Sequence, residues 1–201
     1  MIRYAYINNL VLDIYKRLPD INFPLNPLEA LSLMPNCRYM SYSDFAKISH
    51  ISVEDVISLC ESRFGCTHYD VAQNRYLILC NQSSDGNNNS GRQRWTLAHE
   101  LGHIFCRHLE APAKIKLCHE AFAQPVNIEH EMEADNFART LLAPMPLIRY
   151  LGISSVADVQ NTFGLSTEAS INTYKKYLNW KSSHYKTAWE ADLVRAYLGE
   201  K

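Results

Sequence analysis

The sequence lacks the features that mark several large classes of protein. None of its 201 residues lies in an apolar run near the roughly 18 residues that span a bilayer. Residues 1–18 mix charged and amide side chains with apolar ones, so no signal-peptide core is present. The formal net charge of -1 gives no general attraction to nucleic acid or to an anionic membrane. We therefore expect a cytoplasmic protein with no membrane partner.

Cysteine pairs with metal-binding spacing are also missing. The chain has six cysteines, but none of them forms a CxxC pair, which is the usual unit of a structural zinc site. In a reducing compartment such residues are expected to be free thiols, mostly buried.

The hydrophobic pattern favours an α+β fold dominated by helices. Apolar positions recur at helical spacing over residues 4–18, and two β-prone runs within 66–80 predict an antiparallel hairpin. A polar, turn-rich loop follows at 81–91. Further helices are predicted to start within 28–34, at 43–44 and at 52–55, and to cover about 92–107, 127–142, 154–163, 167–179 and 184–198. We divide the chain into a main domain over 1–150 and a C-terminal helical region over 151–201.

The chemistry is concentrated in His99-Glu100-Leu101-Gly102-His103, an HExxH motif. Residues four apart lie on one face of a helix, so the imidazoles of His99 and His103 can reach one metal ion. Glu100 lies beside that face, where its carboxylate can accept a proton from an attacking water. The surrounding residues are apolar and free of proline, as the motif's helical setting requires.

A catalytic zinc needs a third protein ligand, and the segment 128–138 offers candidates. Its buried stripe is predicted at Ala134, Phe137, Ala138, Leu141 and Leu142. Glu131 lies about 50° from the centre of this stripe at 100° per residue, and His130 lies about 50° away on the other flank. Both remain candidates on this argument. At about 110°, Glu133 is expected at the surface, while Asp135 is placed to accept a hydrogen bond from a ligand imidazole.

Three segments together resemble the ImmA/IrrE family of zinc peptidases. They are RQRWTLAHELGH at 92–103, EMEADNFA at 131–138 and LLAP at 141–144. The resemblance is good over about 66–146 and loose on both flanks. The polar loop at 81–91 and Trp95 depart from the family's usual short linker and phenylalanine.

The resemblance implies a zincin-like domain with a gluzincin-like metal site. His99, His103 and Glu131 would bind Zn²⁺, and Glu100 would be the catalytic base. Such proteins are typical of phages, mobile elements and bacterial stress regulons, and they often cleave a helix-turn-helix repressor. A protein substrate, in particular a transcriptional repressor, is therefore the expected partner. The sequence does not single out a residue that would stabilise the oxyanion, and His108 and His119 flank the metal helix.

Residues 156–171 have the pattern of a helix-turn-helix unit, with Gly164 at the turn. Residues 151–201 carry six Lys and Arg against five Asp and Glu, so no strong basic face is available to meet phosphates. We expect this region to select a protein partner, using the exposed-looking aromatic residues Tyr174, Tyr177, Trp180 and Tyr185. The alternatives are a DNA-binding or sensor regulator, or a toxin-antitoxin component, on a metallopeptidase scaffold.

Overall fold

The computed structural model describes residues 1–82, 90–110, 127–182 and 187–200. In these ranges the strands are β1 (Cys37–Ser41), β2 (Gly65–Asp70) and β3 (Arg75–Cys80). The helices are α1 (Tyr4–Arg17), α2 (Pro27–Leu31), α3 (Tyr42–Ser49), α4 (Val53–Cys60), α5 (Ser90–Phe105), α6 (Ile128–Leu142), α7 (Met145–Tyr150), α8 (Val156–Phe163), α9 (Thr167–Ser182) and α10 (Ala188–Tyr197). The fold is α+β, as the sequence predicts.

The sheet has the strand order β1-β3-β2. The predicted hairpin is confirmed, because β2 and β3 pair antiparallel with Thr67 opposite Ile78. The sequence pattern did not reveal β1, which runs parallel to β3 and pairs Tyr39 with the same Ile78. The sheet is therefore mixed, and β2 lies at one of its edges.

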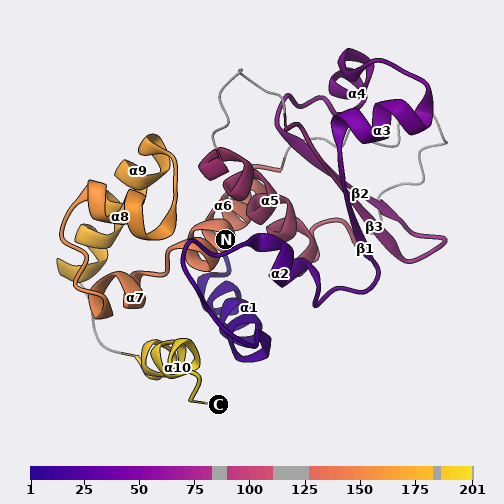
Figure 1. Cartoon of the computed structure of the whole chain (residues 1–201). Coiled ribbons are helices and arrows are strands. Elements are labelled where there is room, and N and C mark those ends of the chain that lie inside the picture. The colour runs from indigo at the N-terminus through magenta and orange to yellow at the C-terminus, as the bar shows by residue number, and fades with distance from the viewer. Residues whose placement is uncertain (83–89, 111–126, 183–186, 201) are drawn as a thin grey trace.

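Helices α5 and α6 form the centre of the molecule, between the sheet and the helices α7–α9 (Figure 1). The predicted stripe of α6 is buried as expected, since Ala134, Phe137, Ala138, Leu141 and Leu142 are all at most 1% exposed. On α5 the buried residues include Leu97, Ala98, Leu101 and Ile104. Burial of such side chains from water is the main force that fixes the two helices against each other.

The chain between α6 and α8 holds a helix that the sequence analysis missed. α6 ends before Pro144 and Pro146. Pro146, however, lies in the first turn of α7, where a missing N–H costs nothing. Gly164 separates α8 from α9 as predicted, with a φ of 61° at the end of α8.

The C-terminal helices pack back onto the main body of the chain. α10 lies against α1, and the indole Nε1 of Trp189 donates to the carbonyl of Asn8 at 2.7 Å. The turn after α8 lies against the start of α5, where Arg94 donates to the carbonyl of Gly164. None of the helices in the described ranges has the length and apolar character of a membrane crossing.

The closest approach of α5 to α6 gives a test of the fold. A Cβ placed on Gly102 would lie 2.9 Å from Cα and 3.1 Å from the carbonyl oxygen of Ala134. Alanine is better than glycine by about 1 kcal/mol in an exposed helix. We nevertheless expect Gly102→Ala to lower the free energy of unfolding by about 1–3 kcal/mol, because backbone atoms must move. Urea unfolding measures this change.

Lys175→Ala, on the exposed side of α9, is the matched control and is expected to stay within about 0.5 kcal/mol of wild type. A Gly102→Ala variant as stable as the control variant would show that the two helices do not approach so closely.

Candidate active site

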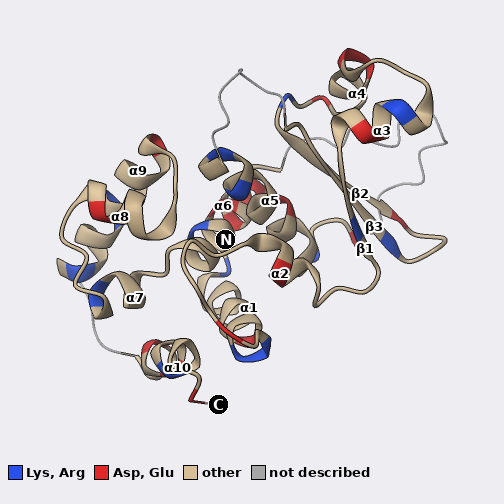
Figure 2. Cartoon of the chain, viewed as in Figure 1, with Lys and Arg blue, Asp and Glu red and all other residues tan. Residues whose placement is uncertain are grey.

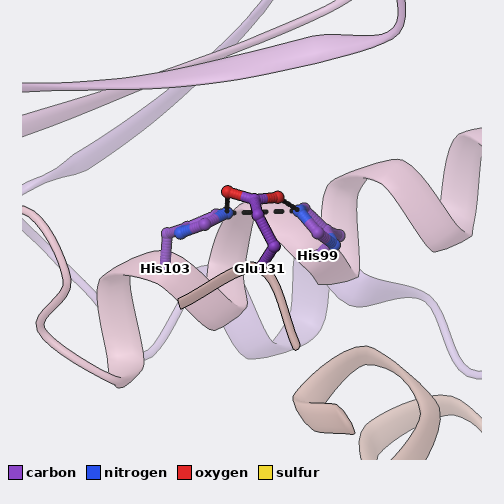
Figure 3. A group of neighbouring side chains, drawn as sticks. All are labelled: His99, His103 and Glu131. Carbon is purple, nitrogen blue, oxygen red and sulfur yellow. Dashed lines mark hydrogen bonds and ion pairs between the residues drawn. The ribbon is translucent and has the colours of Figure 1, made fainter. Parts of the chain in front are cut away.

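The two histidines of the HExxH motif share one face of α5. His99 and His103 are both largely buried, with side-chain exposures of 18% and 13%. The opposite face of the helix is anchored in the core through Ala98 and Leu101, which are fully buried. The helix is thereby held so that both imidazoles point toward α6 (Figure 3).

Glu131 of α6 meets these two rings (Figure 3). Its carboxylate oxygens lie 3.2 Å from Nε2 of His99 and 3.5 Å from Nε2 of His103. The two Nε2 atoms are 3.1 Å apart. Four ligands around zinc at about 2.0–2.1 Å would be separated by about 3.3 Å, so these three atoms are spaced like ligands of one ion.

His130, the competing candidate, is placed elsewhere. Its ring stacks on that of His108, with centroids 4.2 Å apart and planes 1° from parallel. Among the described residues, the group of possible metal ligands around His99 and His103 contains Glu131 and not His130. The structure thus brings together the three residues that the resemblance selects.

Asp135 lies one turn after Glu131 and orients His99. Its Oδ1 is 3.0 Å from Nδ1 of His99 and accepts a hydrogen bond when that nitrogen is protonated. Burial opposes protonation of His99, but the hydrogen bonds to Asp135 and Glu131 raise its pKa to about 10. Burial and the neighbouring His99 lower the pKa of His103 to about 3, so this imidazole is neutral.

Glu100 is buried beside the histidine pair, at 7% exposure. The hydroxyl of Thr67, on the edge strand β2, donates a hydrogen bond of 2.6 Å to its Oε2. Burial raises the pKa of Glu100, against the effect of His99 and of the Thr67 hydrogen bond. A carboxylate with a raised pKa is a stronger proton acceptor, as a general base near neutral pH requires.

These residues line a cleft of about 610 Å³. The metal-binding candidates and Glu100 line it, together with residues at the end of α4 and the start of β2. The remaining lining residues are Cys60, Glu61, Ser62, Phe64, Gly65, Cys66, Thr67, Arg92, Trp95, Thr96, Leu109, Asp135 and Glu168.

The prediction that Glu133 lies at the surface is wrong. Glu133 is 3% exposed, and its carboxylate accepts hydrogen bonds from the backbone N–H and the guanidinium of Arg3 at 2.8 and 3.0 Å. It also lies 2.9 Å from Nε2 of His108. The hydrogen bonds from Arg3 lower the pKa of Glu133 to about 2, so the group is a carboxylate.

Cys106, His108 and Glu133 form a second group with the composition of a metal site. In this group Arg3 already supplies a positive charge, since its guanidinium lies 2.5 Å from the Glu133 carboxylate and donates to the carbonyl of Cys106. A metal ion at this group would have to displace the Arg3 guanidinium or bind beside its positive charge. The first group, at the cleft, is therefore the better metal site.

Other predicted residues have mixed outcomes. Tyr177, expected to be exposed, is 3% exposed, because α9 turns it into the core. His119 and Tyr185 lie outside the described residues. The cysteines that the structure describes, Cys37, Cys60, Cys66, Cys80 and Cys106, are free thiols, as expected.

The contacts of three residues around the site were not predicted from the sequence: Thr67, Arg3 and His108. Thr67 has the alternating pattern of an ordinary strand residue, and only the pairing of β2 with β3 places it over α5. Arg3 is distant in sequence from both motifs. His108, five residues after His103, was noted as a flanking residue without a partner.

Comparison with known protein families gives one match. The peptidase M78 family model, described as an IrrE N-terminal-like domain, matches residues 62–173, which is more than half of the chain. The chain belongs to this family, and the resemblance to ImmA/IrrE proteins is confirmed. The family implies a metallopeptidase-type function, and the cleft offers residues that fit a metal cofactor. No curated protein matches the chain.

The convergence of the three side chains predicts how metal content responds to substitution. We expect Glu131→Ala to lower bound metal strongly, because two imidazoles alone leave the ion one protein ligand short. His130→Ala is the matched control from the same turn of α6 and is expected to keep full occupancy. Atomic emission spectroscopy of the purified variants measures this directly.

Loss of metal in His130→Ala with full occupancy in Glu131→Ala would show that the wrong residue of α6 has been chosen. Circular dichroism of both variants separates loss of the ligand from loss of the fold.

Proposed function

We propose that this protein is a zinc-dependent endopeptidase that cleaves a regulatory protein, such as a helix-turn-helix repressor. The observation that carries the proposal is the meeting of His99, His103 and Glu131 at a cleft that Glu100 also lines. Two imidazoles and one carboxylate with an open side are a donor set suited to catalytic zinc. Membership of a peptidase family supports the reaction class.

His99, His103 and Glu131 would hold the zinc through their Nε2 and carboxylate oxygen atoms. A zinc ion so bound supplies Lewis-acid chemistry, since it polarises a carbonyl and lowers the pKa of a bound water toward about 7. The carboxylate of Glu100 takes a proton from the attacking water and passes it to the leaving amine. Thr67 holds Oε2 of Glu100, and Asp135 fixes the orientation of His99.

The edge strand β2 supports a peptide as the substrate. In the described sheet β2 has β3 as its neighbour, and Gly65, Cys66 and Thr67 line the cleft. An extended segment can add to such an edge through main-chain hydrogen bonds, with its side chains in the cleft. This mode needs an unfolded stretch in the target, such as a linker between the domains of a regulator.

The base is tested by Glu100→Gln. We expect zinc content close to wild type but turnover reduced by at least about 100-fold, because an amide cannot accept the proton. Glu168→Gln, at another acidic residue lining the cleft, is the matched control and is expected to keep its activity. Cleavage of a fluorogenic peptide library gives the rates, and wild-type turnover by Glu100→Gln would remove this residue from the mechanism.

The substrate class has its own test with the same variant. Labelling of new protein N-termini in cells that express wild type or Glu100→Gln should identify a cut in a transcriptional regulator with the wild type alone. Cuts spread over many unrelated proteins would instead indicate a general peptidase.

Charge supports a protein partner over DNA. The charges of α8, α9 and α10 balance (Figure 2). α8 and α10 carry Asp158, Glu190 and Asp192 against the single Arg195, and the three lysines of α9 stand against one Glu168. DNA affinity depends mainly on neutralising phosphates. We expect no specific shift of promoter DNA at moderate salt in a gel-shift titration of the full chain. The full chain is needed because α10 covers α1. Tight, sequence-specific binding would favour the DNA-binding regulator.

A further inference from the structure

His103 has a hydrogen-bonding partner behind it, away from the cleft. After α5 the chain turns through Arg107, with a φ of 61°, and the N–H of His108 donates to the carbonyl of His103 at 2.9 Å. The turn folds the His108 ring back against His103, so that the two Nδ1 atoms lie 3.1 Å apart. The ring planes meet edge to face, at 73°.

The other nitrogen of His108 is bound to a carboxylate. Its Nε2 lies 2.9 Å from Oε2 of Glu133, and the two side chains are only 1% and 3% exposed. Glu133 in turn is held by Arg3 through its backbone N–H and its guanidinium. A continuous hydrogen-bonded network therefore runs from Arg3 through Glu133 and His108 to His103, one of the metal-binding candidates.

The donors and acceptors in this network can be assigned in order, starting from the Glu133 carboxylate. A carboxylate paired with arginine only accepts hydrogen bonds, so Nε2 of His108 carries the proton toward Glu133. Nδ1 of a neutral His108 is then an acceptor, and Nδ1 of His103 must be the donor. The remaining lone pair of His103 lies on Nε2, which is the nitrogen beside His99 and Glu131.

We propose that Arg3, Glu133 and His108 are positioning residues that hold His103 in the tautomer and orientation that present Nε2 to the metal. Asp135 does this for His99 through a single contact. For His103, the carboxylate of Glu133 acts through the imidazole of His108, which lies between them. Partners of this kind change metal affinity by about 10–100-fold when they are removed from ligand histidines. The inference rests on the proposed metal site, and it assigns a role to the buried Glu133.

The test measures zinc affinity by competition with a chelator, for the full chain and three variants. His108→Phe keeps a ring against His130 but removes both nitrogens, and we expect about 10–100-fold weaker binding. His108→Asn places an amide oxygen where Nδ1 stood and should recover part of this loss. His130→Phe keeps the stacking without any bond to His103 and is the matched control, expected within about 2-fold of wild type.

A second measurement uses the unaltered protein, so it does not depend on how well the variants fold. Two-bond ¹⁵N–¹H correlation spectra of histidine distinguish the tautomers. Before zinc is added, we expect His103 protonated at Nδ1 and His108 at Nε2. His108 protonated at Nδ1 instead would overturn the proposal.

The outcomes separate this inference from the proposed function. If the wild type binds no zinc, the proposed function fails. If the wild type binds one zinc and a folded His108→Phe binds it equally well, only the positioning role fails. Equal losses in His108→Phe and His108→Asn would also contradict the role, because the restored acceptor would then have no effect. A second zinc ion bound by Cys106, His108 and Glu133 would overturn the proposal.

Discussion

The site depends on the close packing of α5 against α6. Gly102 lies between the two histidines in sequence and faces Ala134 without a side chain of its own. This lack of a Cβ lets the two backbones approach closely enough for Glu131 to reach His99 and His103. A larger side chain at either position would separate the helices, and ligand distances to one ion tolerate errors of only a few tenths of an ångström.

Charge is arranged around this contact in two groups: Glu131 and Asp135 are about half exposed, and Glu133 is buried. On one side Asp135 and Glu131 balance His99, and on the other side Glu133 is balanced by Arg3. A buried carboxylate without a partner would cost several kcal/mol, so the pairing of Glu133 with Arg3 stabilises the fold. The N-terminal segment thereby takes part in the site although it lies about a hundred residues from the HExxH motif in sequence.

The sequence predicted those features that are set by local periodicity. α5 and α6 follow from apolar spacing and, for the end of α6, from the prolines after Leu142. The hairpin follows from two β-prone runs. The angle to the buried stripe of α6 left Glu131 and His130 equally placed, and the family resemblance selected Glu131. The helices and the hairpin each depend on residues within one turn or one strand.

The remaining features depend on contacts between distant segments. The angular argument that placed Glu133 at the surface assumed one buried face, but α6 packs against both α5 and α1. β1 has only five residues, most of them partly exposed, and so gives little alternation to detect. The contact of Thr67 with Glu100 exists because the edge of the sheet lies over α5, which no local pattern encodes.

The central claim is that one zinc ion is held by His99, His103 and Glu131. X-ray absorption spectroscopy of the zinc-loaded protein tests it most directly, because it identifies the ligand atoms. The account predicts only nitrogen and oxygen neighbours, at about 2.0–2.2 Å, with the outer-shell scattering of two imidazoles. A sulfur neighbour at about 2.3 Å would place the ion at Cys106 or another thiol and contradict the account.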